Sequence, residues 1–346
     1  STSATVLPTR DRRFPWFVTL TTDPEHRKDH TMPMGTILAQ TPAAGQDAAD
    51  LGNMENYFSY TVMQWDAVSH VLTLGVGVFA AALVYFLVSM KDVAPRFRAS
   101  NALSAVVMVS AMLILFRQAF DWETTFSFLP GIGESGRYDR VEGAGFSNGY
   151  RYMNWSIDVP VLLVQMLVVV PLAAKVKASR AAQFVIAGLA MIWTSWAAQF
   201  YEQGNRVEGV ADAPFWIWYF VSWAFYLWII VVVFKTVADS KKHLNAKASR
   251  IMSVILWLLV VSWTLYAVAI VLPRLWWDPG SGVARQYIFT FADIASKAVY
   301  GVLLSWVAMI QSKETDGYVK GAEEELASAH LRERNVSAQT MSTPPA

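Results

Sequence analysis

The sequence predicts an all-α membrane protein built as a bundle of seven transmembrane helices. Of its 346 residues, 54% are hydrophobic and only 16% are charged. The apolar residues gather into long uncharged runs, which is typical of a polytopic membrane protein rather than a soluble domain. Each run is long enough to span a bilayer, because about 20 helical residues cross a hydrocarbon core of ~30 Å.

The composition also excludes several functional classes. The net charge of +1 gives no reason to expect a nucleic-acid partner. The chain has no cysteine, which excludes disulfides, thiolate metal sites and cysteine nucleophiles. Its five histidines lack the spacing of a metal site, and there is no phosphate-binding loop, serine nucleophile elbow or HExxH pattern. We therefore expect a protein that is not an enzyme.

Three regions of different composition divide the chain. Residues 1–57 are polar and rich in proline, threonine and charged side chains, and we expect a mostly disordered extension there. Residues 58–313 contain all the apolar runs and form the predicted membrane domain. Residues 314–346 are polar again and are interpreted as a cytoplasmic tail.

The predicted spans alternate with loops of different charge. The spans are Ala67–Met90, Ala99–Phe116, Gly149–Ala174, Ala181–Tyr201, Ala213–Phe234, Ile251–Pro273 and Arg285–Gln311. Lysine and arginine concentrate in the first, third and fifth connecting loops, so the positive-inside rule predicts an extracellular N-terminus and a cytoplasmic C-terminus. The long loop Asp121–Asn148 is then extracellular, and its short aromatic pieces between turn residues predict a hairpin.

The seventh span carries two opposite charges without any proline or other evident interior break. Asp293 and Lys297 are four residues apart and therefore share one helix face. A charge at the bilayer centre costs about 2.5–3.5 kcal/mol on insertion scales, so the pair indicates a functional site. A lysine in an apolar site can form a Schiff base with a carbonyl compound, and Asp293 would supply the anion beside it. A structural ion pair between helices is the alternative.

The third span carries a polar stripe. Arg151, Asn154, Asp158 and Gln165 recur at helical spacing and lie on one face. Such a stripe must face the protein interior or a hydrated path. Polar contacts that only join helices are the alternative for the two amides, but two charges each need a partner.

Three short motifs carry a resemblance to a known family. They are Arg-Tyr-x-x-Trp beginning at Arg151, Trp-x-x-Tyr beginning at Trp263 and Asp-x-x-x-Lys beginning at Asp293. In these motifs the chain resembles the microbial rhodopsins over about residues 55–313. The resemblance implies that Lys297 carries all-trans retinal as a protonated Schiff base.

The subfamily is indicated by three positions on the third span. Asn154, Asp158 and Gln165 occupy the positions that distinguish the subfamilies, and Asn-Asp-Gln is similar to the light-driven sodium pumps. The runs Asn101–Ser110, Gln199–Glu202 and Ala284–Gln286 are also similar to that subfamily. The implied function is a light-driven outward sodium pump in a bacterial plasma membrane, assembled as a homo-oligomer, a pentamer by resemblance. A light-driven proton pump is the nearest alternative, and a sensory photoreceptor or a light-gated cation channel also stays open.

The resemblance implies a role for each site residue. Asp158 and Asp293 share the counterion role, and Asp158 accepts the Schiff-base proton before turning toward Asn154 or Ser110. Na⁺ is then bound transiently by Asn154 and Asp293, whose oxygens suit a hard cation. The implied retinal pocket contains Trp155, Val159, Leu162, Met191, Ser195, Tyr219, Ser222, Trp263, Tyr266 and Ser296. The implied ion path contains Asn101, Gln165 and Ser305 for uptake, Arg151 as the barrier to backflow, and Glu202 and Arg285 at the exit.

Three residues depart from the family pattern. Ala267 stands where a proline usually follows the sixth-span tyrosine, so we expect a weaker kink there. Ser305 replaces a glycine near the uptake end. Arg117 is an added charge at the end of the second span, and we interpret it as a side chain that extends to the extracellular interface.

Overall fold

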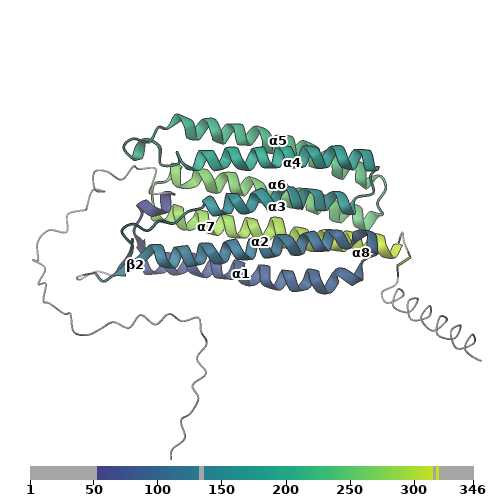
Figure 1. Cartoon of the computed structure of the whole chain (residues 1–346), viewed down its shortest axis with the longest axis horizontal. Coiled ribbons are helices and arrows are strands. Elements are labelled where there is room, and N and C mark those ends of the chain that lie inside the picture. The colour runs from purple at the N-terminus through teal and green to yellow at the C-terminus, as the bar shows by residue number, and fades with distance from the viewer. Residues whose placement is uncertain (1–52, 132–135, 315–316, 319–346) are drawn as a thin grey trace, which may run out of the picture. The chain divides into compact units, whose positions relative to one another are not determined.

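The computed structural model describes residues 53–131, 136–314 and 317–318. Within them, seven helical segments are long and apolar enough to cross a membrane, and they run side by side as a bundle (Figure 1). The predicted fold class is therefore confirmed. The expectations for residues 1–52 and 319–346, which make up most of the extension and the tail, lie outside the described residues.

The bundle is built from neighbours in sequence. Helices α1 and α2 pack together, α3 lies between α2 and α4, α5 packs on α4 and α6, and the seventh span contacts α1, α6 and, through α8, α3. The helices are α1 (Val62–Ser89), α2 (Pro95–Thr125), α3 (Gly149–Val169), α4 (Ala174–Gln199), α5 (Ala213–Lys241) and α6 (Ala246–Leu275). The seventh span consists of α7 (Pro279–Asp293), the π-helical segment η6 (Ile294–Val299) and α8 (Tyr300–Glu314), and the 3₁₀ turns are η3 (Met54–Tyr57), η4 (Met90–Asp92) and η5 (Gly204–Arg206).

Most helices extend beyond the uncharged runs used to predict them, because local caps set their ends. The Thr61 hydroxyl accepts from the Gln64 backbone at 3.2 Å while the Gln64 side chain accepts from the Thr61 backbone at 3.0 Å. This reciprocal capping box starts α1 at Val62 rather than Ala67. Helix α2 has no side-chain cap and begins instead with Pro95, at a position where the missing N–H of proline costs nothing.

Two predictions about helix continuity were wrong. The third span ends at Val169 rather than Ala174, because Val170 precedes Pro171 and takes an extended conformation with ψ 140°. The seventh span is not regular throughout, since the π-helical segment η6 surrounds Lys297. A π turn contains more residues than an α turn, and such turns are frequent at functional sites.

A small sheet closes the end of the bundle where the predicted hairpin lies. Strands β2 (Phe126–Leu129) and β3 (Arg137–Arg140) pair antiparallel, and β1 (Tyr60–Thr61) joins the other edge of β3. The loop begins later than predicted, because α2 continues to Thr125. Stacking of Trp65 on Tyr138, with ring centroids 4.3 Å apart, attaches the sheet to α1.

The predicted boundary between residues 57 and 58 was also too late. Residues 53–57, which were assigned to the polar extension, form η3 and its cap, and Met54 and Glu55 are fully buried. Gly282 permits this approach, because a side-chain carbon there would lie 3.1 Å from the Tyr60 hydroxyl and 3.6 Å from Glu55 Cγ. The folded membrane domain therefore includes η3.

Candidate functional site

The site is centred on the Lys297 amine between α3 and the seventh span. Its Nζ lies 2.9 Å from Asp158 Oδ2 and 2.8 Å from Asp293 Oδ1, and it donates to Asn154 Oδ1 at 3.0 Å. All four side chains are buried. Removing one of these charges would leave a buried charge without its partner, which is energetically costly. Each of the three charged groups therefore depends on the others to remain buried.

The two carboxylates have different surroundings. Asp293 accepts hydrogen bonds from Tyr266 at 2.7 Å and from Trp155 and Arg151 at 3.1 Å, in addition to its contact with Lys297. These donors fix it as an anion.

Asp158 has fewer donors. Its ion pair with Lys297 is its recorded contact, and neither of its oxygens has a hydrogen-bond partner among the described residues, while the Ser110 hydroxyl accepts a hydrogen bond from the neighbouring Asn154 amide. Asp158 is therefore the less constrained of the two carboxylates and the one better placed to take up a proton. The sequence suggested shared counterions, and the structure adds this asymmetry.

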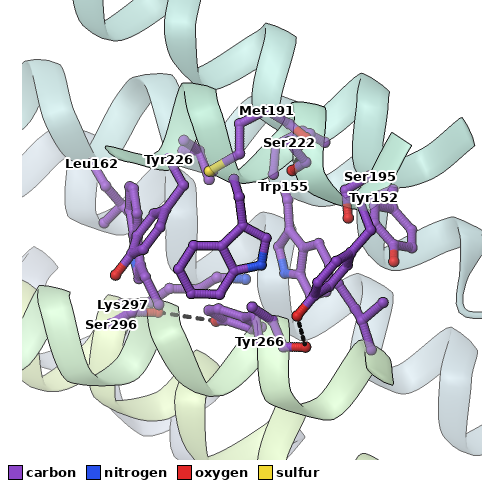
Figure 2. Close-up of a pocket in the computed structure, with 17 residues that line it drawn as sticks. Tyr152, Trp155, Leu162, Met191, Ser195, Ser222, Tyr226, Tyr266, Ser296 and Lys297 are labelled. Carbon is purple, nitrogen blue, oxygen red and sulfur yellow. Dashed lines mark hydrogen bonds between the residues drawn. The ribbon is translucent and has the colours of Figure 1, made fainter. Parts of the chain in front are cut away.

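A largely apolar cavity leads away from Lys297. Figure 2 shows Lys297, Ser296 and Tyr266 on one side of it and Met191, Ser195 and Ser222 on the opposite side. The ten side chains that the resemblance assigned to the pocket all border this cavity, together with Lys297 itself. A long apolar molecule attached to the lysine nitrogen fits an enclosure of this chemistry.

Six further residues line the cavity and were not predicted. Most lie one helical turn after a predicted residue, as Tyr226 follows Ser222 and Ile270 follows Tyr266. That i, i+4 spacing was a usable signal. The six are Tyr152, Ile192, Trp223, Tyr226, Ala267 and Ile270.

A polar network connects the Lys297 group to the end of the bundle that carries the sheet. Arg151 bridges Asp293 and Gln286, with 3.1 Å to each, and Gln286 donates to Glu55 Oε1 at 2.7 Å. Arg285 then contacts both Glu55 and Glu202, with 2.8 Å from Nη1 to Glu202 Oε2. We call this chain of side chains, from Arg151 to Glu202, the sheet-end network.

Glu55 is the member that sequence reasoning missed. It belongs to the segment assigned to the polar extension, and only its position just before the first span could have indicated it. Burial opposes ionisation of Glu55, but the charge and hydrogen bonds of Arg285 outweigh it and hold the Glu55 pKa below its ordinary value. The carboxylate is therefore ionised, and it is one of two anions on a single buried guanidinium.

Near the opposite end of the path, uncharged side chains are buried between α2, α3 and the seventh span. Gln165 Nε2 donates to Ser104 at 2.6 Å, and Asn101 Nδ2 donates to Ser89 at 3.2 Å. Three buried oxygens have no hydrogen-bond partner among the described residues, namely Asn101 Oδ1, Gln165 Oε1 and Ser305 Oγ. We call this set the amide-end group. No cluster of three or more histidine or acidic side chains suited to a metal occurs in the described part of the chain.

Two of the departures from the family pattern have visible consequences. Arg117 is half exposed, but it also forms an ion pair with Asp121 at 2.7 Å and lies over the Tyr150 ring, contacts that the interface interpretation did not include. Helix α6 continues without interruption through Ala267, whose carbonyl accepts a hydrogen bond from Tyr219 at 3.2 Å.

Comparison with known proteins identifies the family. The model of the family described as bacteriorhodopsin-like protein matches residues 66–311, so the chain belongs to that family. A green-light absorbing proteorhodopsin from Gamma-proteobacterium EBAC31A08 is 20% identical over 235 residues, which cover 67% of this chain and 82% of the relative.

Solved structures give the same result. Xanthorhodopsin, described as a light-driven ion pump with dual chromophore, superposes with a TM-score of 0.67 at 27% identity, covering 76% of this chain and 99% of its own. Halorhodopsin from Halobacterium salinarum, in a bromide-bound form, superposes with a TM-score of 0.54 at 18% identity, covering 71% and 96%, and at that identity it supports only the fold.

The protein is therefore a multi-pass membrane protein of the microbial-rhodopsin type, a light-driven ion pump and not an enzyme. Members of this family bind retinal covalently through a lysine, and so does this chain. Lys297 is the lysine that the structure buries within the described residues, and it borders the apolar cavity.

Proposed function

We propose that the protein is a light-driven outward sodium pump that carries retinal on Lys297. The observation that carries this proposal is the contact between Lys297 Nζ and the neutral oxygen of Asn154, 3.0 Å away and beside Asp158. An amide at this position supplies an oxygen ligand without a second negative charge on α3. A proton would be held better by a carboxylate, whereas a weak oxygen ligand suits a cation that must be released again.

The proton on the Lys297 nitrogen has to leave before a cation can pass. Two unit positive charges 4 Å apart repel by about 4 kcal/mol at an effective dielectric constant of 20. Retinal, when bound, supplies the light absorption and the isomerisation that drive the cycle. Asp158 Oδ2 accepts the proton from 2.9 Å. Once neutral, Asp158 pairs with Ser110 or Asn154 and no longer attracts a positive charge.

Sodium then passes between oxygen ligands. Asp293 supplies a carboxylate and Asn154 a carbonyl oxygen, which are the ligands that hard cations prefer. Return of the proton from Asp158 to the Lys297 nitrogen restores the positive barrier behind the ion. Arg151, held 3.1 Å from Asp293, opposes backflow from the sheet end.

The two ends of the path support an uptake and an exit role. The unpartnered oxygens of the amide-end group, on Asn101, Gln165 and Ser305, can replace part of the hydration shell of an entering ion. Gln165 carries no ionisable proton and cannot reprotonate the lysine nitrogen, which disfavours a dedicated proton pump. Glu202 and Arg285 line the proposed exit, and the basic loops orient the amide end toward the cytoplasm.

A proton pump remains the rival, because Asp158 can accept the proton whether or not sodium follows. The deciding measurement is the external pH of an illuminated cell suspension in NaCl and in KCl. We expect alkalinisation in NaCl that a protonophore increases, since protons then enter passively after the exported charge. If a protonophore abolishes the signal and protons move outward in both salts, the proton pump replaces the sodium pump. The homo-oligomeric state stays a prediction from resemblance.

A further inference from the structure

A second cavity opens between α4 and α5, at the end of the bundle that carries the basic loops. It shares no lining residue with the cavity at Lys297. The polar side chains around it are Lys175, Ser179, Arg180 and Gln183 from α4 and Lys235 from α5. Helix α5 packs on α4 and α6 and lies with α4 at the upper edge of the bundle in Figure 1. Lys175, Ser179 and Lys235 are exposed, and none of the lining residues belongs to the proposed ion path.

The cavity has an excess of positive charge. Lys175, Arg180 and Lys235 line it, and among the described residues the carboxylate that pairs with one of them is Asp239, which contacts Arg180 and also Lys242, the latter at 2.8 Å. Nη1 of Arg180 is buried and has no hydrogen-bond partner among the described residues. A buried guanidinium N–H without an acceptor is costly, so the cavity favours an anion with several oxygens.

Apolar side chains continue from this cavity along α5. Val231 is exposed there, and Trp228, one turn before the cavity residue Val232, donates from Nε1 to Gln183 Oε1 at 3.3 Å. Tryptophan is enriched where the hydrocarbon meets the headgroups. The surface therefore combines a cationic cavity near the start of α4 and the end of α5 with apolar side chains farther along α5.

We propose that this cavity binds the phosphodiester headgroup of an anionic glycerophospholipid, with an acyl chain along α5. Lys175, Lys235 and Arg180 Nη1 contact the phosphate oxygens, and Trp228 and Val231 contact the chain. Free phosphate has the same anionic oxygens as the headgroup, but it has no acyl chain to contact the apolar side chains of α5. The proposal holds for either transported ion, because none of these residues belongs to the path.

The test is native mass spectrometry of the purified, retinal-loaded protein with phosphatidylglycerol or phosphatidylcholine added in detergent. We expect selective retention of phosphatidylglycerol and its loss in the double variant Lys175→Gln/Lys235→Gln. At about 1 kcal/mol for each basic residue near an anionic headgroup, affinity falls about twentyfold to thirtyfold. Lys241→Gln/Lys247→Gln is the matched control, since these lysines lie at the same end of the bundle outside the cavity. Visible absorption verifies that each variant is folded.

Each other outcome overturns the proposal. Equal retention of phosphatidylcholine means that the cavity does not select charge. An equal loss in the control variant means that surface charge alone attracts the lipid. Displacement of the lipid by millimolar inorganic phosphate or glycerol phosphate means that the site takes free phosphate. Should the double variant not fold, Lys175→Gln and Lys235→Gln are measured singly, and normal retention in both rejects the site.

Discussion

The two ends of the proposed ion path are built on opposite principles. At the sheet end, Arg285 lies between two buried carboxylates, Glu55 and Glu202, and the charged groups are ion-paired, although Arg151 Nε has no hydrogen-bond partner among the described residues. At the amide end, no member is charged and three buried oxygens have no partner among the described residues. An ion must break existing ion pairs to pass through the sheet-end network. An oxygen without a hydrogen-bond partner can bind a cation without giving up an existing contact. The comparison suggests that the sheet end acts as a barrier to ions and that the amide end takes up the entering cation.

The largest effect should come from replacing Lys297, which lies between the two ends of the proposed path and carries the retinal. Lys297→Ala removes the buried amine beside the apolar cavity, and we expect a colourless protein without covalently bound retinal. The measurement is visible absorption after retinal addition, followed by borohydride reduction. Lys241→Ala, which changes an exposed lysine, should keep full colour. A reducible coloured product in the Lys297 variant would contradict the assignment.

The next effect concerns ion choice at the same centre. Asn154→Asp adds a second titratable anion on α3 beside Lys297, which favours a proton over sodium as the transported species. We expect the alkalinisation in NaCl to disappear and acidification to take its place. The control is Ser156→Ala, because Ser156 lies on α3 and its hydroxyl donates to the Tyr152 carbonyl of its own helix at 2.8 Å. Unchanged alkalinisation in the Asn154 variant would show that this amide does not select sodium.

Breaking the sheet-end network should strongly reduce stability. Arg285→Met leaves two buried carboxylates without their cation, and removal of one partner from a buried ion pair costs about 3–5 kcal/mol. The readout is the temperature at which the visible absorption is lost. Arg117→Gln breaks a solvent-screened surface pair and should lower that temperature far less. Equal losses in the two variants would mean that the sheet-end network is not the stabilising one.

The pH dependence of the same network has a definite sign. The Glu55 pKa lies below its ordinary value of 4.5 in the folded protein, so its ionised form stabilises the fold above that value. This contribution is lost as the pH falls from 4.5 through the folded-state pKa. We therefore expect Glu55→Gln to be less stable than the wild type at neutral pH, with the difference shrinking below pH 4.5. A difference that grows on acidification would contradict the proposed Glu55–Arg285 pairing.

The smallest effect on stability should come from the amide end. Ser305→Ala removes a buried hydroxyl whose oxygen has no partner among the described residues, and such a change can be nearly neutral or stabilising. We expect the free energy of unfolding to lie within about 0.5 kcal/mol of that of the wild type. The sodium-dependent steps of the photocycle after a light flash should be slower. Thr236→Ala, with a hydroxyl bonded to the Val232 carbonyl at 2.7 Å, is a control away from the path. A large stability loss in the Ser305 variant would remove the contrast between the two ends.

What the sequence by itself determined are the features with a strong local signal. Uncharged runs longer than a bilayer is thick predicted the seven-helix bundle. The four-residue spacing of Asp293 and Lys297 predicted their contact, and the polar stripe on α3 predicted which of its residues face inward. These patterns depend on helix geometry alone, so no knowledge of neighbouring helices was required.

Only the tertiary structure decided which residues far apart in the sequence form ion pairs. Glu55 lies 230 positions before Arg285, and no local pattern indicates that a turn before the first span packs against the seventh. The asymmetry between Asp158 and Asp293 likewise depends on donors from α3 and α6 that meet at Asp293 only in the folded bundle. Helix ends and the π turn at Lys297 were missed for the same physical reason: capping bonds and packing against neighbours outweigh hydrophobicity at each position.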